Sequence, residues 1–382
     1  MTFQFLDVGM GDGTLVQIRE DMADYDTLIL VDFGEARSQF KAPITDALTY
    51  LVNTINANSK DRNRPDPYVD WLLLTHPDQD HCNRVGALVN ANYPDYPKKK
   101  LRFGNLAFAG QRTEYEDNLI DKVICPQLAA APQLLADRAH SSISGKTVKP
   151  FIECGDVKAY LLSANYPTRD ASNTNAKSIV LMFELGKHKV ILPGDAEHAT
   201  EKEIIKNFGH IDGFLKVFAL KLGHHGSEAA SSQDWVTATS PKAIFSSSDF
   251  VWAHPYCKTI CRFVQAGTLS SFPDDVWYCC GHRDIYYNNT TRLNICTNLR
   301  YYVKSPAGEY LEELDGGMWR SIYGDAGNTF GVQWQLYCDG VRDPSIIATD
   351  SVRPADASKI PEGWDCKHPP YLAAVGDDDP SE

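Results

Sequence analysis

The sequence predicts an α/β protein in which buried strands carry clusters of polar side chains to one edge of a sheet. The main observation is residues 71–81, WLLLTHPDQDH, where an apolar run of strand length without a helical period leads into imidazoles and carboxylates. Other apolar runs along the chain also end at polar clusters, and amphipathic segments lie between some of them. Open α/β sheets bind ligands at the carboxyl ends of their strands, so these clusters are predicted to converge.

Composition is that of an ordinary globular protein. The chain has 382 residues, of which 43% are hydrophobic and 23% charged, enough to bury a sizeable core. Its net charge of -13 argues against broad attraction to nucleic acid or anionic membranes. The negative net charge is still compatible with a local site at which bound cations make the electrostatic potential positive.

The expected compartment is the cytoplasm, with no membrane association. No apolar stretch approaches the roughly 20 residues that span a bilayer. The first residues lack the basic start and long apolar core of a signal peptide. The 10 cysteines form no paired C-x-x-C modules, as expected for reduced residues.

The first third of the chain alternates between strand and helix patterns. Glycines between the first two strands provide the positive φ angles of a tight turn. Strands are predicted at 3–8, 14–19 and 27–31 and at the start of the central motif at 69–81, and helices at 44–57 and 84–92. Residues 93–150 follow no clear pattern and are predicted to be an insertion.

After the insertion the strand pattern returns. Strands are predicted at 157–163, 178–184, 190–193, 214–222 and 243–247, with a helix at 200–208. Candidate ligands follow four strands of the chain, at 76–81, Asp195, His224–His225 and His254. This recurrence indicates a functional site more strongly than any single histidine does.

The cluster after the apolar run at 71–74 is the most specific signal. His76, Asp78, Asp80 and His81 crowd one loop because Pro77 breaks the strand. Side chains packed this densely repel or stay hydrated unless a cation gathers them. A solvated polar turn is the alternative, and the H-x-D-x-D-H pattern behind a buried strand favours a metal site.

Several segments carry a family resemblance. FLDVGMGD at 5–12, THPDQDH at 75–81, LPGD at 192–195, KLGHHGS at 221–227 and HP at 254–255 occur in this order. Together they resemble the metallo-β-lactamase-fold hydrolases, in particular the branch similar to the hydrolase domain of the ComEC DNA-uptake protein. The resemblance implies an αβ/βα four-layer sandwich with a binuclear metal site on one edge. The predicted domains are a hydrolase domain at 1–300, with 93–150 as its insertion, and an aromatic-rich extension at 301–382 with a disordered acidic tail.

The resemblance also implies a ligand set. One metal site would take Asp80, His81, Asp195 and one histidine of the pair, His225 in preference to His224. The other site would take His76 and Asp78 and share Asp195.

Two departures from the family pattern affect the predicted metal. Many relatives carry histidine at the position of Asp78, and a further histidine in the loop where this chain has Asn175. Oxygen ligands shift preference from zinc toward manganese or magnesium. We therefore expect two divalent ions, zinc or manganese, with magnesium as a further option. An aspartate at 195 suits a bridging carboxylate and resembles phosphodiesterase and nuclease branches.

The predicted chemistry is hydrolysis by a metal-bound hydroxide. Two cations about 3.5–4 Å apart can hold a hydroxide and neutralise a pentavalent transition state, because a metal lowers the pKa of bound water to about 7. Asp80 or Asp78 would orient the water, and His254 is predicted as an acid or a phosphate contact, with a structural role as the alternative.

Three further residues are candidates for substrate binding: Asn175, Lys221 and Ser227. For Lys221 a position that merely flanks a strand is the favoured alternative.

The function predicted is that of a phosphodiesterase or nuclease acting on nucleic acid. The alternatives are a hydrolase of a small ester, thioester, lactone or cyclic nucleotide, and a metal-stabilised binding module with weakened catalysis. Free-standing relatives of this branch occur beside antiphage genes, which suggests phage defence as a hypothesis. The expected partners are nucleic acid or nucleotide, and proteins that contact the aromatic extension.

Overall fold

The computed structural model describes most of the chain up to residue 247 and shorter segments beyond it. The described residues are 1–8, 11–19, 25–36, 44–167, 173–247, 254, 259, 262–263, 266, 294–297, 302–304, 310–314, 318–321, 332–342 and 344–350. The acidic tail and the proline-rich segment before it lie outside these residues.

The first sheet has 8 strands in the order β20-β19-β1-β2-β3-β4-β5-β6. Its strands are β1 (Thr2–Phe5), β2 (Gly13–Arg19), β3 (Asp26–Phe33), β4 (Tyr68–Leu74), β5 (Arg102–Phe108), β6 (Gln133–Leu134), β19 (Val332–Tyr337) and β20 (Ser345–Asp350). Strands β20 to β3 pair antiparallel, and β3 to β6 pair parallel.

The second sheet has 7 strands in the order β15-β14-β13-β12-β11-β10-β9. Its strands are β9 (Ile152–Cys154), β10 (Val157–Ser163), β11 (Val180–Leu185), β12 (His188–Leu192), β13 (Ala219–Lys221), β14 (Ala243–Ser246) and β15 (Asn294–Thr297). Strands β12 to β15 run parallel, so their carboxyl ends share one edge of the sheet.

Helices and short strands complete the described elements. The helices are α1 (Ile44–Asp61), α2 (Gln79–Cys82), α3 (Val85–Val89), α4 (His198–Phe208), α5 (Gln233–Thr239), η1 (Arg112–Glu114), η2 (Glu116–Asn118), η3 (Leu119–Ile124), η4 (Cys125–Gln127), η5 (Asn175–Lys177) and η6 (Gly223–Gly226). The remaining strands are β7 (Ile143–Ser144), β8 (Thr147–Val148), β16 (Tyr302–Lys304), β17 (Tyr310–Leu314) and β18 (Met318–Ser321). No helix among the described residues is long and apolar enough to cross a membrane.

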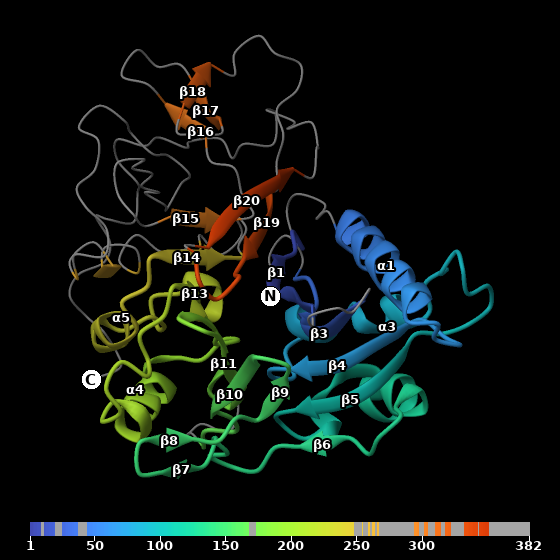
Figure 1. The fold of residues 1–382 in the computed structure, drawn as a ribbon, viewed down its shortest axis with the longest axis horizontal. Helices are drawn as coiled ribbons and strands as arrows, with labels where there is room; N and C mark the ends of the chain where they lie inside the picture. Colours follow the sequence, from blue (N-terminus) through green and yellow to red (C-terminus); the bar gives the residue numbers. More distant parts are fainter. Residues whose placement is uncertain are drawn as a thin grey trace.

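The layers follow from where the apolar side chains lie. A central core joins the two sheets, and in it the rings of Phe3 and Phe183 meet edge to face at 5.5 Å. A second cluster lies between the first sheet and helices α1 and α3, and a third between the second sheet and helices α4 and α5. Helices therefore cover the outer face of each sheet (Figure 1), which confirms the predicted α/β fold with four layers.

Several predicted elements differ from the structure in length: the strand expected at 3–8 ends at Phe5, the helix expected at 44–57 extends to Asp61, and two others are shorter than expected. The strand expected at 214–222 is confined to Ala219–Lys221, because the preceding residues pack into the cluster beneath α4 and α5 instead of pairing with β12 and β14. The helix expected at 84–92 spans only Val85–Val89. At the end of this helix the Asn90 side chain donates a hydrogen bond of 2.8 Å to the carbonyl of Gly86.

Strands from the predicted C-terminal extension belong to the first sheet. Strand β19 pairs antiparallel with β1, and β20 pairs with β19 (Figure 1). The domain boundary at residue 300 stays a prediction, and this sheet spans it.

Candidate metal centre

The predicted site residues lie where strands of both sheets end. His76 and Asp78 follow β4, Asp80 and His81 lie on α2, and Asp195 follows β12. Two glycines permit this close packing. A side chain at Gly34 would overlap the backbone of Asp80, and a Cβ at Gly194, which has φ +57°, would lie 2.8 Å from the Cβ of Thr75.

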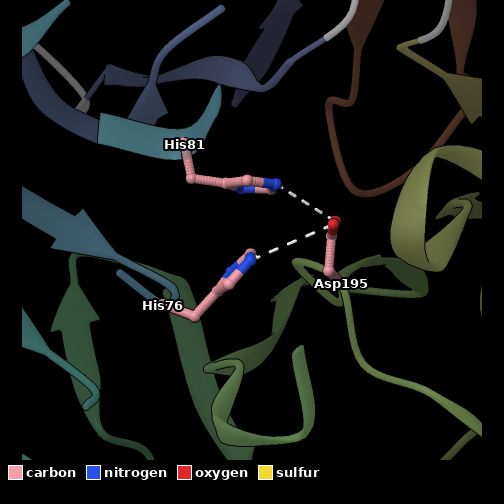
Figure 2. Close-up of side chains that lie close together, drawn as sticks. All are labelled: His76, His81 and Asp195. Carbon is pink, nitrogen blue, oxygen red and sulfur yellow. Dashed lines mark ion pairs between the residues drawn. The ribbon is translucent and has the colours of Figure 1, made fainter. Parts of the chain in front are cut away.

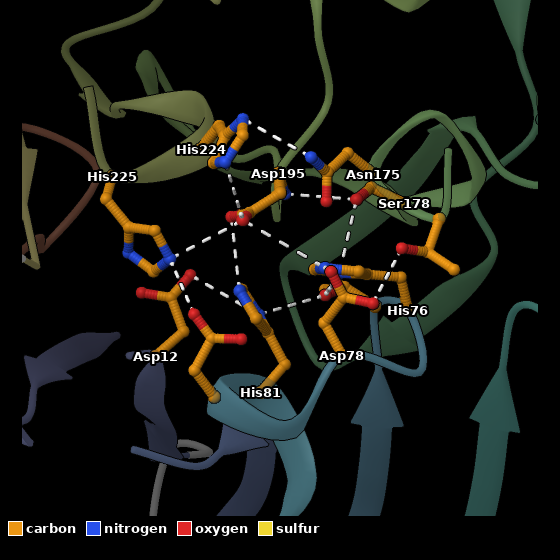
Figure 3. A network of polar contacts seen from close by, with 12 residues as sticks. Asp12, His76, Asp78, His81, Asn175, Ser178, Asp195, His224 and His225 are labelled. Atoms are coloured by element: carbon orange, nitrogen blue, oxygen red, sulfur yellow. Dashed lines mark hydrogen bonds and ion pairs between the residues drawn. The ribbon is translucent and has the colours of Figure 1, made fainter. Parts of the chain in front are cut away.

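The carboxylate of Asp195 lies at the centre of the cluster (Figures 2 and 3). Its Oδ1 is 3.2 Å from Nε2 of His81, and its Oδ2 is 3.4 Å from Nε2 of His225 and 4.0 Å from Nε2 of His76. Asp80 Oδ2 is 3.2 Å from the same Nε2 of His225. The structure thus gathers residues that are far apart in the chain around one carboxylate.

Buried atoms of this cluster make no hydrogen bond, although Nε2 of His81 and Oδ1 of Asp195 lie 3.2 Å apart. Among the described residues they include Nε2 of His76, Nε2 of His81 and Oδ1 of Asp195. Buried polar atoms are rarely left without partners, because each costs about 1–3 kcal/mol. All three point at the same small volume, so the donor set fits a divalent cation.

The opposite nitrogen of each ring is already engaged. His225 donates from Nδ1 to the carbonyl of Ser247 at 2.8 Å, and Nδ1 of His81 lies 2.8 Å from Asp32 Oδ2. The Thr75 hydroxyl donates to Asp32 Oδ2 at 2.6 Å, so it can accept from Nδ1 of His76 at 3.0 Å. These contacts fix the rings with Nε2 directed at the cluster, as is usual for metal-binding histidines.

The charges of the cluster are strongly coupled. Burial alone would lower the pKa of His81, but Asp195 and Asp32 raise this pKa well above its ordinary value. Burial alone would raise the pKa of Asp195, but His225 and His81 hold that pKa well below the ordinary range. Several buried carboxylates at one place require balancing positive charge, which a metal ion provides.

Asp78 lies on the solvent side of the cluster. Its Oδ2 is 3.5 Å from Nε2 of His76, and its Oδ1 accepts a hydrogen bond from the Thr174 hydroxyl at 2.6 Å. Its side chain is 38% exposed, compared with 4% for Asp195. Asp78 is therefore the more accessible of these two carboxylates.

The histidine pair lies in a loop of unusual backbone conformation. Both histidines of η6 have positive φ, 46° for His224 and 55° for His225. His224 Nε2 is 4.0 Å from Asp195 Oδ2, and its Nδ1 is 3.4 Å from Oε1 of Glu197. The structure thus brings both histidines to Asp195, although from different sides (Figure 3).

His254 lies beside the histidine pair. Its ring is parallel to that of His225, with centroids 6.3 Å apart, and edge-on to that of His224 at 5.8 Å. It is buried. The structure brings His254 to the site, and its role as an acid stays a prediction.

Lys221 and Ser227 make internal contacts. Lys221 is buried, and its Nζ is 2.6 Å from Asp12 Oδ2. The Ser227 hydroxyl accepts a hydrogen bond from the backbone N–H of Ala229 at 3.3 Å. Their predicted contacts with substrate stay predictions, and in this structure both side chains face protein groups.

Three carboxylates at the site had no role assigned from sequence: Asp12, Asp32 and Glu197. Asp12 and Asp32 lie close enough to His81 to form a candidate metal-binding group. Each follows a strand pattern, which is a usable signal, but carboxylates after strands are too common to single these out. Only the fold brings them to the histidines.

The fold and the site together define a class of protein. An α/β sandwich with two facing sheets and a histidine–aspartate cluster at their shared edge is the metallo-β-lactamase fold.

Comparison with known proteins identifies the relatives. The chain is 28% identical over 196 residues to ComE operon protein 3 of Bacillus subtilis, covering 50% of this chain and 22% of the relative. It is 34% identical over 253 residues to Recombination protein 2 of Haemophilus influenzae, covering 66% of this chain and 25% of the relative. These similarities confirm the predicted resemblance to the ComEC-like branch. The chain spans about a quarter of the length of these relatives.

Other comparisons are weaker. No family model matches the chain. Among solved structures, the short form of human tRNase Z covers 64% of this chain and 92% of its own, with 11% identity and a TM-score of 0.36.

Proposed function

We propose that the chain is a metal-dependent hydrolase that cleaves phosphodiester bonds, in nucleic acid rather than in small nucleotides. The observation that carries the proposal is the set of buried, unpartnered imidazole and carboxylate atoms around Asp195. A carboxylate at the centre of two groups of ligands suits a pair of cations, and paired cations are characteristic of phosphoryl-transfer sites.

Two ligand sets share Asp195 in this proposal. The better-formed set is Asp80, His81 and His225, whose ligand atoms lie within 4.8 Å of one another. The other set begins with His76 and Asp78. When bound, two divalent cations make water nucleophilic at neutral pH and neutralise charge that develops on phosphate oxygens.

The chain's own residues have further roles. Asp78, held by Thr174 and half exposed, can accept a hydrogen bond from the attacking water. His254, next to His224 and His225, can donate a proton to the leaving oxygen. The buried Lys221 neutralises Asp12 behind the cluster and so limits its negative charge.

The test is metal analysis combined with a substrate panel. Purified protein should contain divalent metal and should hydrolyse at least one of plasmid DNA, single-stranded DNA, RNA and a cyclic nucleotide. Asp195→Ala should abolish both metal binding and turnover, because it removes the carboxylate that both ligand sets share. Asp212→Ala, at an exposed aspartate, is the matched control. An active D195A protein would refute the mechanism, and activity on lactones or thioesters alone would assign a different substrate class.

A further inference from the structure

The loop that carries Asn173 and Asn175 is engaged with a carboxylate. Asn173 Nδ2 donates to Glu197 Oε2 at 3.0 Å, and Asn175 Nδ2 donates to Glu197 Oε1 at 3.2 Å. The two amides thus hold both oxygens of one side chain. Asn175, predicted to bind substrate, has its amide directed at Glu197.

Glu197 in turn contacts a histidine of the pair. Its Oε1 lies 3.4 Å from Nδ1 of His224, while Nε2 of that ring lies 4.0 Å from Oδ2 of Asp195. Figure 3 shows His224 joined to both Asn175 and Asp195, on the opposite side of the Asp195 carboxylate from His81. The two nitrogens of His224 therefore face Glu197 and the metal cluster respectively.

The position of Glu197 argues against an ordinary structural role. It is the N-cap residue of α4, where a side-chain oxygen usually accepts a hydrogen bond from the first turn. Its side chain makes no such bond and is turned to the asparagine loop instead.

We infer that His224 is a ligand of the metal site that contains His76 and Asp78, and that Glu197 is the residue that positions it. The inference rests on the metal centre of the proposed function and goes beyond it. With the shared Asp195, the site formed by Asp80, His81 and His225 has four ligands. The site formed by His76 and Asp78 has only three when Asp195 is included. His224 completes the smaller set from the opposite side. The asparagine loop supports it through Glu197 and also directly, because Nδ2 of Asn175 lies 3.4 Å from Nδ1 of His224.

The physical reason is control of the ring's tautomer and orientation. A carboxylate that accepts from Nδ1–H leaves Nε2 free to bind a cation and makes it a stronger donor. A glutamine at the same place can donate to Nδ1 and so favour the tautomer with hydrogen on Nε2. Loss of such a partner typically weakens metal affinity 10–100-fold.

The experiment titrates chelator-stripped protein with Mn²⁺ by calorimetry and follows Co²⁺ binding by visible absorption. Glu197→Gln should weaken one of two binding sites by about 10–100-fold. His224→Ala should weaken the same site at least as much, and the double variant should lose no more than H224A alone. Both variants should change the Co²⁺ spectrum of that site, because its ligand field depends on the imidazole. Glu203→Gln on the same helix and the exposed His210→Ala are matched controls, expected to bind as wild type.

Specific results would overturn the inference. If H224A keeps both sites at full affinity, His224 is no ligand. If H224A weakens a site and E197Q does not, Glu197 has no positioning role. Should E197Q fail to fold, as judged by thermal melting of metal-free protein, Asn173→Ala removes one support of Glu197 and should weaken the same site less. A wild-type protein that binds two metals but cleaves no phosphodiester would refute the proposed function alone, whereas one that binds no metal would refute both.

Discussion

The carboxylate of Asp32 offers the sharpest test of how the site is held. Its Oδ2 accepts from the Thr75 hydroxyl at 2.6 Å and lies 2.8 Å from Nδ1 of His81, and its Oδ1 accepts from the backbone N–H of Thr75 at 2.8 Å. Asp32 also has φ 56°, a conformation that asparagine tolerates about as well as aspartate. Asp32→Asn therefore changes charge and hydrogen bonding without adding backbone strain.

The expected size of the effect follows from these contacts. In Asp32→Asn one carboxylate oxygen is replaced by an NH2 group, which donates hydrogen bonds and cannot accept them. Nδ1 of His81 would then lose its acceptor, and the tautomer of His81 would no longer be fixed. Metal affinity should fall about 10–100-fold. The buried pair with His81 would also lose one charge, and breaking such a pair costs about 3–5 kcal/mol. Asp32→Ala should be worse, because it leaves the Thr75 N–H without a partner and disfavours the positive φ.

Calorimetric metal titration and urea unfolding of metal-free protein measure the two effects separately. Asp26→Asn on the same strand is the control, since Asp26 pairs with a largely exposed Arg19 and such pairs contribute about 0–1 kcal/mol. A D32N protein that binds metal and unfolds like wild type would refute the conclusion that Asp32 orients His81.

Three further predictions concern other parts of the site and its support. His254→Ala should keep its metal content and lose about 10²–10⁴-fold in turnover on nucleic acid, but less on a nitrophenyl phosphodiester. Equal losses on both substrates would exclude the acid role. Lys221→Met should lower the free energy of unfolding by about 3–5 kcal/mol in urea titrations, because Asp12 would keep a buried charge without its partner. An unchanged unfolding midpoint would contradict this. Burial raises the pKa of Glu201 from 4.5 to about 7, although two backbone N–H groups that donate to its carboxylate oppose this rise. Protonated Glu201 therefore stabilises the folded state below pH 4.5, and this contribution to the free energy of unfolding is lost as the pH rises through about 7. The difference in unfolding free energy between wild type and Glu201→Gln should change by about 3 kcal/mol over this interval, and a flat difference would show that Glu201 ionises normally.

Much of the fold was predictable because its signals are local. The run at 71–74 is apolar on both faces, as a strand covered by two layers must be, and β4 is found there. His76, Asp78, Asp80 and His81 lie close together in the sequence, so their proximity needed no tertiary information. Asp195 and the histidine pair could be added because they also follow predicted strands.

The supporting residues were not predictable, because their contacts are long-range. Asp32 acquires its role only when β3 pairs with β4 and brings it to Thr75 and His81. Glu197 lies in a sequence that looks like an ordinary helix start, and nothing local shows that its side chain turns away from α4. The strand at 214–222 was predicted too long for a related reason: apolar side chains can be buried against helices as well as in a sheet.

The pairing of β1 with β19 has a consequence for folding during synthesis. The backbone N–H of Cys338 donates to the carbonyl of Met1 at 2.9 Å, so chain segments from the two ends of the described sequence are neighbours in one sheet. Ribosomes add about 5–20 residues per second, so β1 waits on the order of tens of seconds for this neighbour. Completion of the first sheet is therefore a late event, and until then the first strand has an open edge that chaperones or other chains can pair with.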